Sequence, residues 1–364
     1  MKSNTIVIGI ILILLVTSIL PVTICSEPSS KIDKYIDTRV TIDIIRSPSE
    51  FEQATELIVS WPTLYREEPF FINIIRASEK AVSVRINVNN PLYKNRIIAL
   101  LEKESIPLDN ITISPIPTNS YWIRDYGPFF IEKNGVLSIV DFNYLGHRSR
   151  LIDDIYPTIY GIQNKIEYDF KANFALCIQG GNYISDGKGL AMVADNPLEY
   201  GNPGKTLEEM SGILKQYLGL NEVLILESQV DDGTGHIDMF SKLINEDSLI
   251  VGQWNDINDV NYQILENNTQ LLIDNGYNII RIPMLRDPDE EKNAIWTYTN
   301  SLIINGTNKK IVLVPQYNTT DDSVAISIYK NAMPEYEIIG INCNIVIDYW
   351  GAIHCTTMTR PLIE

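Results

Sequence analysis

Short runs of β-branched and other apolar residues alternate along the chain with longer stretches whose apolar residues recur at helical spacing. Runs of the first kind predict strands at Glu56–Ser60, Val82–Val88, Ile111–Pro115, Val136–Asn143, Val223–Leu226, Ser248–Val251, Asn278–Ile282, Ser301–Ile304, Ile311–Val314, Glu337–Ile341 and Ile345–Ile347. Stretches of the second kind predict helices at Phe70–Glu79, Asn90–Glu104, Thr206–Leu218, Tyr262–Asn275 and Asp321–Asn331. This alternation predicts an α/β protein with roughly five repeats of mixed strands and a helix, but it does not reveal a symmetry.

Glycine-rich and asparagine–glycine segments mark turns between these elements. Lys133-Asn134-Gly135 and Asn305-Gly306 are typical of hairpin turns. Gly180-Gly181-Asn182 and Asp186-Gly187-Lys188-Gly189 lie on either side of a short strand and lack the strand-to-helix context of a phosphate-binding loop. We interpret them as backbone that approaches a site closely, with Asn182 as a candidate site residue.

The net charge of the chain limits the classes of binding partner that we expect. A net charge of -17 over 364 residues argues against nucleic acid or an anionic membrane surface as the main partner. It is compatible with attraction of a cationic ligand, although acidic surfaces also serve solubility. The composition predicts an ordinary globular protein and leaves the oligomeric state open.

The N-terminus is typical of a targeting segment. Lys2 precedes the apolar run Ile6–Leu20, which suits a signal peptide and is short for a membrane span. We therefore expect residues 1–25 to be a signal peptide or an N-terminal anchor, residues 26–40 a linker, and residues 41–364 the catalytic domain. Cys25 raises lipidation as an alternative, against which stands the large Ile24 before it. The expected location is outside the cell, either secreted or attached to the outer face of the membrane. Four sequons fit this location, at Asn110, Asn267, Asn305 and Asn318.

Cysteine and histidine are sparse. Removal or lipidation of Cys25 would leave Cys177, Cys343 and Cys355, an odd number that predicts at least one unpaired thiol. The cysteine spacings do not match a zinc site, and with only three histidines we do not expect a structural metal.

Four short polar motifs far apart in the chain contain residue types that one active site could use. Cys355 follows a glycine-containing turn and His354, whose positive charge could lower the pKa of the thiol; the alternative is a buried structural cysteine. His236 and Asp238 would point to one face of an extended segment, as a general acid–base pair or a surface ion pair. Asp125 lies among Trp122 and Tyr126, where a carboxylate is costly unless it pairs with a cation, from a ligand or from Arg124.

These groups suit a flat guanidinium cation. Two carboxylates can bind its N–H groups, an indole can stack on its face, a thiolate can attack its central carbon and an imidazole can transfer protons. The chain resembles the peptidylarginine deiminases of the bacterial, Porphyromonas type and the related agmatine deiminases. The resemblance is carried, in family order, by Trp122–Pro128, Gln179–Tyr183, Gly235–Phe240 and Gly351–Cys355.

The resemblance implies a pentein α/β-propeller with five pseudo-symmetric ββαβ-type modules. It also implies cofactor-free hydrolysis of a guanidinium C–N bond through a covalent thiouronium. Cys355 would be the nucleophile, His236 the general acid–base, and Asp125 and Asp238 the carboxylates that bind the guanidinium. Asn300 would support the thiol, and Trp122 would line the substrate channel.

The substrate is predicted from a segment that resembles the carboxylate-binding stretch of the peptidylarginine deiminases. Arg148 and Arg150 are the candidate ligands of an α-carboxylate, at a spacing shifted by one residue. They favour C-terminal peptidyl arginine or free arginine, whereas solvent-exposed arginines would leave agmatine as the substrate. A catalytically silent pentein that binds cationic peptides is a second alternative.

Overall fold

Five small sheets make up the part of the chain that the computed structural model describes, which is residues 43–62, 67–145, 150–289 and 294–363. Their strand orders are β1-β5-β6-β7, β10-β9-β8, β11-β12-β13-β14, β15-β16-β17 and β18-β2-β3-β4. Residues Asp43–Glu364 group into one compact unit. The predicted signal peptide or anchor, the linker, Cys25 and Arg148 lie outside the described residues.

The strands are β1 (Ile45–Arg46), β2 (Ala54–Ser60), β3 (Ser83–Asn87), β4 (Ile111–Ser114), β5 (Phe129–Lys133), β6 (Val136–Val140), β7 (Glu167–Asp169), β8 (Ile184–Ser185), β9 (Leu190–Ala194), β10 (Glu222–Leu226), β11 (Ser241–Leu243), β12 (Ser248–Trp254), β13 (Asn278–Arg286), β14 (Ile295–Thr297), β15 (Leu302–Asn305), β16 (Lys310–Gln316), β17 (Glu337–Asn342) and β18 (Thr357–Pro361). The α-helices are α1 (Glu68–Ser78), α2 (Pro91–Lys103), α3 (Ile123–Tyr126), α4 (Tyr156–Asn164), α5 (Asp195–Gly201), α6 (Leu207–Leu218), α7 (Val260–Asp274) and α8 (Asp321–Ala332). Short 3₁₀ helices are η1 (Phe170–Phe174), η2 (Gly180–Asn182), η3 (Ile237–Met239) and η4 (Ile347–Tyr349).

One unit of structure recurs in every sheet: an antiparallel pair of strands followed by a parallel pair whose connection carries a helix. Thus β15 pairs antiparallel with β16, and β16 reaches its parallel neighbour β17 through α8. The same order holds for β5-β6-β7, β8-β9-β10 and β11-β12-β13. A helical crossover is what a parallel pair requires. The predicted α/β class and five-unit organisation are therefore confirmed.

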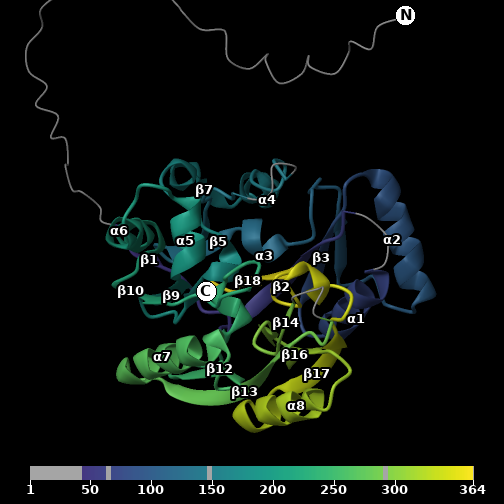
Figure 1. The fold of residues 1–364 in the computed structure, drawn as a ribbon. Coiled ribbons are helices and arrows are strands. Elements are labelled where there is room, and N and C mark those ends of the chain that lie inside the picture. The colour runs from purple at the N-terminus through teal and green to yellow at the C-terminus, as the bar shows by residue number, and fades with distance from the viewer. Residues whose placement is uncertain (1–42, 63–66, 146–149, 290–293, 364) are drawn as a thin grey trace, which may run out of the picture. The chain divides into compact units, whose positions relative to one another are not determined.

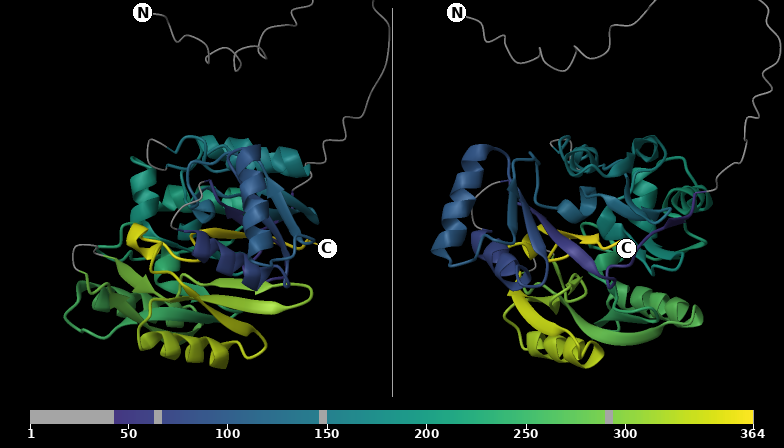
Figure 2. Two further views of the ribbon diagram at one scale, coloured as in Figure 1. Left: turned by 90° about the vertical axis from the view of Figure 1, so that its right-hand side faces the viewer. Right: turned by 180° about the vertical axis from the view of Figure 1, so that it is seen from behind.

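The last strand of the chain completes the first unit. β18 pairs antiparallel with β2, and β2 continues through α1 to its parallel neighbour β3. The two ends of the folded unit are thereby joined in one sheet, and Figure 1 shows β18 beside β2 near the centre of the molecule. Seen from two further sides in Figure 2, the helices lie outside the strands.

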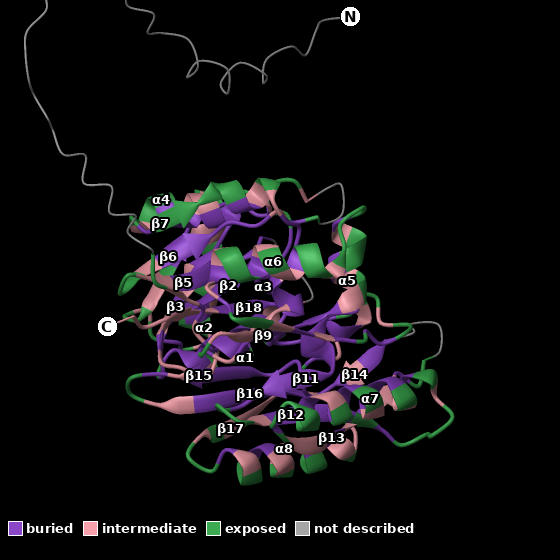
Figure 3. Ribbon diagram, turned by 90° about the vertical axis from the view of Figure 1, so that its left-hand side faces the viewer, coloured by how far each residue is buried: buried purple, intermediate pink, exposed green. Residues whose placement is uncertain are grey.

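Local sequence explains the ends of several elements. The side chain of Thr206 accepts from the backbone N–H of Glu209 in a capping box at the start of α6, and Gly219 ends the helix with φ 67°. Asn134 and Gly135, both with positive φ, form the predicted turn between β5 and β6. Figure 3 shows buried strands beneath helices whose outer faces are exposed, as amphipathic helices require. None of the helices within the described ranges is long and apolar enough to cross a membrane.

The prediction of a strand at Ile345–Ile347 is wrong. The N–H groups of Val346 and Ile347 both donate to the carbonyl of Cys343, which turns the chain back into η4. Val346 and Ile347 are buried in the largest core cluster, so the apolar character of this run reflects core packing. A short apolar run does not by itself distinguish a strand from such a turn.

Candidate active site

The segments that lead into the first strand of successive modules carry the candidate catalytic residues. Asp125 lies in α3 before β5, and Asp238 lies in η3 before β11. Asn300 lies just before β15, and Cys355 just before β18. The remaining segment, η2 before β8, contacts both α3 and η3. The modules repeat one order of elements, so these segments occupy equivalent places in the fold. They meet there and bring residues distant in sequence to one site.

The thiol of Cys355 contacts two of the predicted residues. Its Sγ lies 3.1 Å from Nδ2 of Asn300 and 3.6 Å from Oδ2 of Asp238. Oδ1 of Asn300 also accepts from the backbone N–H groups of Ala352 and Cys355, at 3.1 Å and 3.3 Å. Asn300 therefore both donates to the sulfur and holds the turn that carries it. Cys177, Cys343 and Cys355 are all free, which confirms the prediction of an unpaired thiol.

Gly181 marks the point where the acidic groups and the imidazole converge. Nδ1 of His236 lies 3.6 Å from Oδ1 of Asp125. A Cβ atom at Gly181 would lie 2.6 Å from Nδ1 of His236, 2.9 Å from Oδ1 of Asp125 and 3.2 Å from Oδ2 of Asp238. A residue without a side chain is thus required here. The interpretation of Gly180–Asn182 as backbone that approaches the site closely is confirmed.

The backbone that carries His236 and Asp238 differs from the prediction. The two residues were expected in an extended segment, but His236 caps the 3₁₀ turn η3, which contains Asp238. Asn182 supports this turn: its Oδ1 accepts from the N–H of Ile237 at 3.2 Å, and its amide group bonds both backbone polar groups of Ala194. Asn182 thus lies at the site with its side chain engaged by backbone, as a support for His236.

Burial sets the protonation of the central groups. It raises the pKa of Cys355 well above its usual range, and the carboxylates of Asp238 and Asp125 add to this effect. Burial and Asp238 likewise raise the pKa of Asp125 well above its ordinary value, and burial lowers the pKa of His236. The expectation that His354 lowers the pKa of the thiol is wrong, because His354 hydrogen-bonds Asp238 and Glu50 instead.

Three buried polar atoms at the centre have no hydrogen-bond partner among the described residues: Oδ1 of Asp125, Oδ1 of Asp238 and Nδ1 of His236. Unpaired buried acceptors cost free energy, about 1–3 kcal/mol each in typical cases. A planar cation with several N–H groups would satisfy the two carboxylates, and it would offset the like charge between them.

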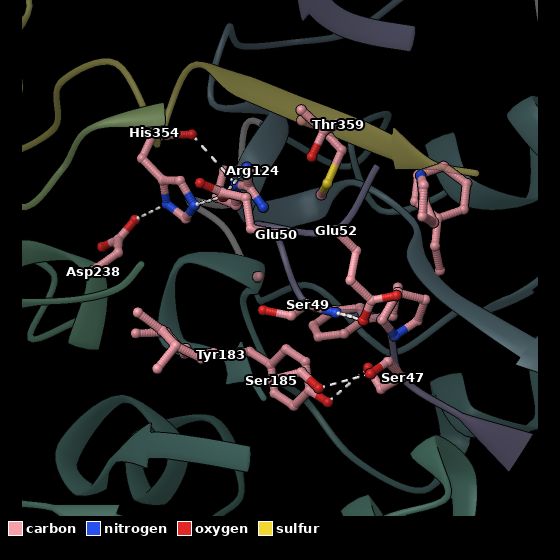
Figure 4. A pocket seen from close by; sticks show the side chains of 18 of the residues that line it. Ser47, Ser49, Glu50, Glu52, Arg124, Tyr183, Ser185, Asp238, His354 and Thr359 are labelled. Carbon is pink, nitrogen blue, oxygen red and sulfur yellow. Dashed lines mark hydrogen bonds and ion pairs between the residues drawn. The ribbon is translucent and has the colours of Figure 1, made fainter. Parts of the chain in front are cut away.

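Glu50 is the main element of the site that sequence analysis missed. Its Oε2 lies 2.6 Å from Nε2 of His354 and 3.1 Å from Nη2 of Arg124, and its Oε1 pairs with Lys242. Nδ1 of His354 in turn lies 2.7 Å from Oδ2 of Asp238. Figure 4 shows this chain of contacts from Glu50 through His354 to Asp238.

This series of contacts links two acids through His354. Each ring nitrogen of His354 has a carboxylate oxygen at hydrogen-bond distance, Asp238 at Nδ1 and Glu50 at Nε2. Burial opposes ionisation of Glu50, yet Lys242, His354 and Arg124 hold its pKa well below the ordinary value. Burial also opposes ionisation of Asp238, but the hydrogen bond from His354 together with the charges of His354, His236 and Arg124 outweighs it and lowers the pKa of Asp238. The contacts from Glu50 through His354 therefore keep Asp238 ionised beside the thiol.

Two cavities adjoin the centre. One, of about 570 Å³, is lined by Trp122, Asp125, Arg150 and Cys355 and gives access to the thiol. The other, of about 110 Å³, is lined by Glu50, Arg124, Lys242, His354 and Asp238 and does not include Cys355. The larger cavity is therefore the candidate substrate pocket.

The predicted channel residues that the structure describes line this pocket. A Cβ atom at Gly351 would lie 2.4 Å from the indole of Trp122 and 3.1 Å from Cβ of Cys355, so the indole packs beside the nucleophile turn. Arg150 is partly buried, and its Nη1 lies 3.4 Å from the hydroxyl of Tyr144. In the described ranges no group of three or more His, Cys, Asp or Glu side chains is arranged to hold a metal ion.

Comparison with known proteins decides the family. The profile of the Porphyromonas-type peptidyl-arginine deiminases matches residues 46–361 of this chain. The chain belongs to this family. Deiminases of this family are hydrolases that act on the C–N bonds of guanidino groups, so the protein is a deiminase of arginine-like guanidino compounds.

Solved structures support the same fold. A putative arginine deiminase from Porphyromonas gingivalis superposes with a TM-score of 0.77 at 25% identity, over 87% of this chain and 98% of that chain. An agmatine deiminase from C. jejuni with substrate bound superposes with a TM-score of 0.75 at 20% identity, over 87% and 96% of the two chains. Among curated relatives, a putative agmatine deiminase of Latilactobacillus sakei is 24% identical over 90% of this chain and 99% of its own length. The predicted pentein fold of the deiminases is thus confirmed.

Proposed function

We propose that this deiminase acts on arginine with a free α-carboxylate, above all the C-terminal arginine of a peptide, and releases citrulline and ammonia. The observation that carries this proposal is Arg150 on the wall of the substrate pocket. In the described ranges its one hydrogen-bond partner is the hydroxyl of Tyr144, and no carboxylate lies within salt-bridge distance of it. A partly buried cation without a paired anion favours an anionic ligand.

The pocket therefore presents opposite charges at two places. Asp125 on the pocket wall, and Asp238 behind it at 3.6 Å from the thiol, suit the guanidinium, and Arg150 suits the α-carboxylate of the same arginine. Both ends of a C-terminal arginine would then be paired in one pocket. An arginine inside a peptide has an amide in place of this carboxylate and would leave Arg150 unpaired.

In the first half of the reaction, Cys355 forms a covalent bond to the substrate. The bound cation offsets the negative charge of Asp125 and Asp238, so the thiol loses its proton more readily, toward the neutral imidazole of His236. The sulfur adds to the central guanidinium carbon, giving a tetrahedral adduct. His236 returns the proton to one amino group, the C–N bond breaks, and ammonia leaves. The product of this half is a thiouronium on Cys355.

In the second half, water replaces the sulfur. His236, neutral again, takes a proton from the water as its oxygen adds to the thiouronium carbon. The adduct collapses with cleavage of the C–S bond: its hydroxyl proton goes to the departing sulfur, which forms the ureido group of citrulline and returns the thiol, and His236 releases its proton to solvent. Asp125 and Asp238 hold the reacting carbon in place through both halves.

Binding of the cation is expected to depend on pH through Asp125. The pKa of this group is raised in the empty site, so below that pKa the cation must displace a proton. Arginine should bind to the Cys355→Ala variant more tightly as pH rises, by up to about tenfold per pH unit, until Asp125 is ionised in the free protein. Calorimetry in buffers of different ionisation enthalpy should show proton release on binding, and Cys355→Ala/Asp125→Asn should show none from this group. Binding that is equally tight across the acidic range would contradict the assignment.

Agmatine is the second candidate substrate, and one observation favours it. Asp232 also lines the pocket, its Oδ2 has no hydrogen-bond partner among the described residues, and burial raises its pKa to about 6. The ammonium group of agmatine would suit this carboxylate. Several relatives are also named as agmatine deiminases, at identities too low to decide the substrate.

Arg150→Ala separates these candidates. We expect the variant to raise the KM for N-acetyl-glycyl-arginine about 10- to 100-fold, the usual loss for a charge-assisted hydrogen bond, and to change kcat/KM for agmatine little. Ammonia release with each substrate measures both values. Arg76→Ala is the matched control. Arg76 lies on helix α1 and forms an ion pair with Glu104, the residue that follows helix α2. An equal loss on both substrates, or turnover of agmatine alone by the parent protein, would refute the proposal.

We also propose that the protein acts outside the cell, as the apolar run Ile6–Leu20 indicates. Such a location would expose it to peptides with C-terminal arginine. Fractionation of cells that express the full chain tests this point, and retention in the cytoplasm would contradict it.

A further inference from the structure

We propose that a second cavity beside the substrate pocket binds the side chain of the residue that precedes the C-terminal arginine, and that it prefers an aromatic or large aliphatic side chain. The inference rests on the proposed function, because it takes the α-carboxylate at Arg150 as its starting point. It adds a preference within the class of peptide substrates.

The two cavities share one wall. The second cavity has a volume of about 350 Å³ and shares Trp122, Arg150, Tyr349 and Trp350 with the substrate pocket. Arg150 thus lies at the boundary between them. A peptide whose terminal carboxylate is bound by Arg150 has its preceding residue next to this boundary, within reach of the second cavity.

The lining of this cavity is largely aromatic. Tyr121, Trp122, Tyr349, Trp350 and Pro62 supply most of the wall. Besides Arg150, the two remaining lining residues are polar, and their hydrogen bonds are directed elsewhere. The hydroxyl of Ser120 donates to Asp153 at 2.7 Å, and Oδ1 of Asn119 accepts from the N–H of Ile152 at 2.7 Å. Such a surface suits an apolar side chain.

The backbone of Trp350 is strained in a way that a packing role does not explain. Trp350 has φ 60° and ψ 42°, the left-handed region that bulky residues rarely adopt. Its indole is 43% exposed, so the strain does not serve to bury it in the core. Residues held in such conformations cluster at ligand-binding sites.

Gly233 accommodates this conformation. A Cβ atom at Gly233 would lie 2.3 Å from the indole of Trp350, so the chain leaves room there for the ring. The strained residue and the glycine opposite it together hold an exposed indole at the boundary of the two cavities. Tyr349 beside it is 54% exposed. An apolar side chain between these rings would remove part of their surface from water.

Charge disfavours a basic residue in the same place. Once the α-carboxylate has neutralised Arg150, the cavity offers no acidic side chain among its lining residues to receive a second cation.

Two acetylated dipeptides test the proposal in the full-length enzyme. We expect kcat/KM for N-acetyl-phenylalanyl-arginine to exceed that for N-acetyl-glycyl-arginine about tenfold, as partial burial of a phenyl ring implies. In Trp350→Gly, which removes the indole and tolerates positive φ, the ratio should fall to within about twofold. Phe174→Ala is the matched control, since Phe174 is an exposed aromatic residue that lines neither cavity. It should keep the tenfold ratio.

The outcomes distinguish the two proposals. Equal kcat/KM for the two dipeptides in the parent enzyme, or an unchanged ratio in Trp350→Gly, would overturn the subsite while leaving the substrate class intact. Agmatine turnover with no release of ammonia from either dipeptide would overturn the proposed function itself. A preference for an acidic or basic preceding residue over phenylalanine would also overturn the apolar subsite.

Discussion

Replacement of Cys355 with alanine is expected to lower kcat for guanidinium hydrolysis by about 10⁴-fold or more, because no other group can form the covalent bond to the substrate. The variant should retain its fold, since it loses one buried sulfur whose polar contacts are those to Asn300 and Asp238. It should still bind arginine, because Asp125, Asp238 and Arg150 remain. Ammonia release measures the loss, and calorimetry measures the binding that persists.

Cys343→Ala is the matched control for this change. Cys343 is likewise free and completely buried, but its sulfur donates to the carbonyl of Ile341 in the core. Its replacement should lower the Tm, as other core truncations do, and leave kcat within about twofold of the parent. If Cys355→Ala released ammonia as fast as the parent, the proposed mechanism would be wrong. Tight peptide binding by a parent protein without any turnover would instead favour the catalytically silent binding protein.

Replacement of Glu50 with glutamine is expected to lower kcat by about 10²- to 10³-fold, although Glu50 does not touch the candidate substrate pocket. The change removes the carboxylate that holds His354 against Asp238. Without it the pKa of Asp238 should rise, so less of the enzyme carries the ionised form that binds the guanidinium. The acid limb of the kcat/KM profile should therefore move to higher pH, which a purely structural loss would not cause.

Stability is the confounding variable in this experiment, because Glu50 also pairs with Lys242 and Arg124. Loss of one partner of a buried ion pair typically costs about 3–5 kcal/mol. Glu56→Gln is the control, since Glu56 is a buried glutamate that pairs with Arg85 and accepts from Tyr160, remote from the thiol. It should lower the Tm comparably and leave the pH profile in place. If both variants gave the same profile as the parent, Glu50 would have no positioning role.

Sequence and structure agree most closely where the residue type itself carries the chemistry. Cys355, His236, Asp238, Asp125 and Asn300 were all candidates from local motifs, and the structure brings them together. Their separate motifs each allowed an ordinary structural explanation, such as a buried cysteine or a surface ion pair. Their order along the chain was informative because each lies in the segment before the first strand of a module.

Glu50 shows why the rest was not predictable. It lies close in sequence to Glu52, and both follow the same polar segment. Glu52 pairs with Arg46 near the surface, whereas Glu50 meets Lys242, His354 and Arg124 in the interior. Those partners lie in strand β11, just before strand β18 and in helix α3, so no local pattern distinguishes the two glutamates. Trp350 is similar, because neither its positive φ nor its place between two cavities is visible in the residues around it.

The sequence by itself determined the class of fold, the repeat of strand and helix, and the set of nucleophile, imidazole and carboxylates, because periodicity and residue type are local properties of a chain. The tertiary structure alone decided which glutamate supports Asp238, in which direction the pKa of Cys355 shifts, and that Arg150 lies on the wall of the pocket beside the thiol. Each of these depends on burial and on charges supplied by segments far away in the sequence, and such quantities exist only once the modules have packed together.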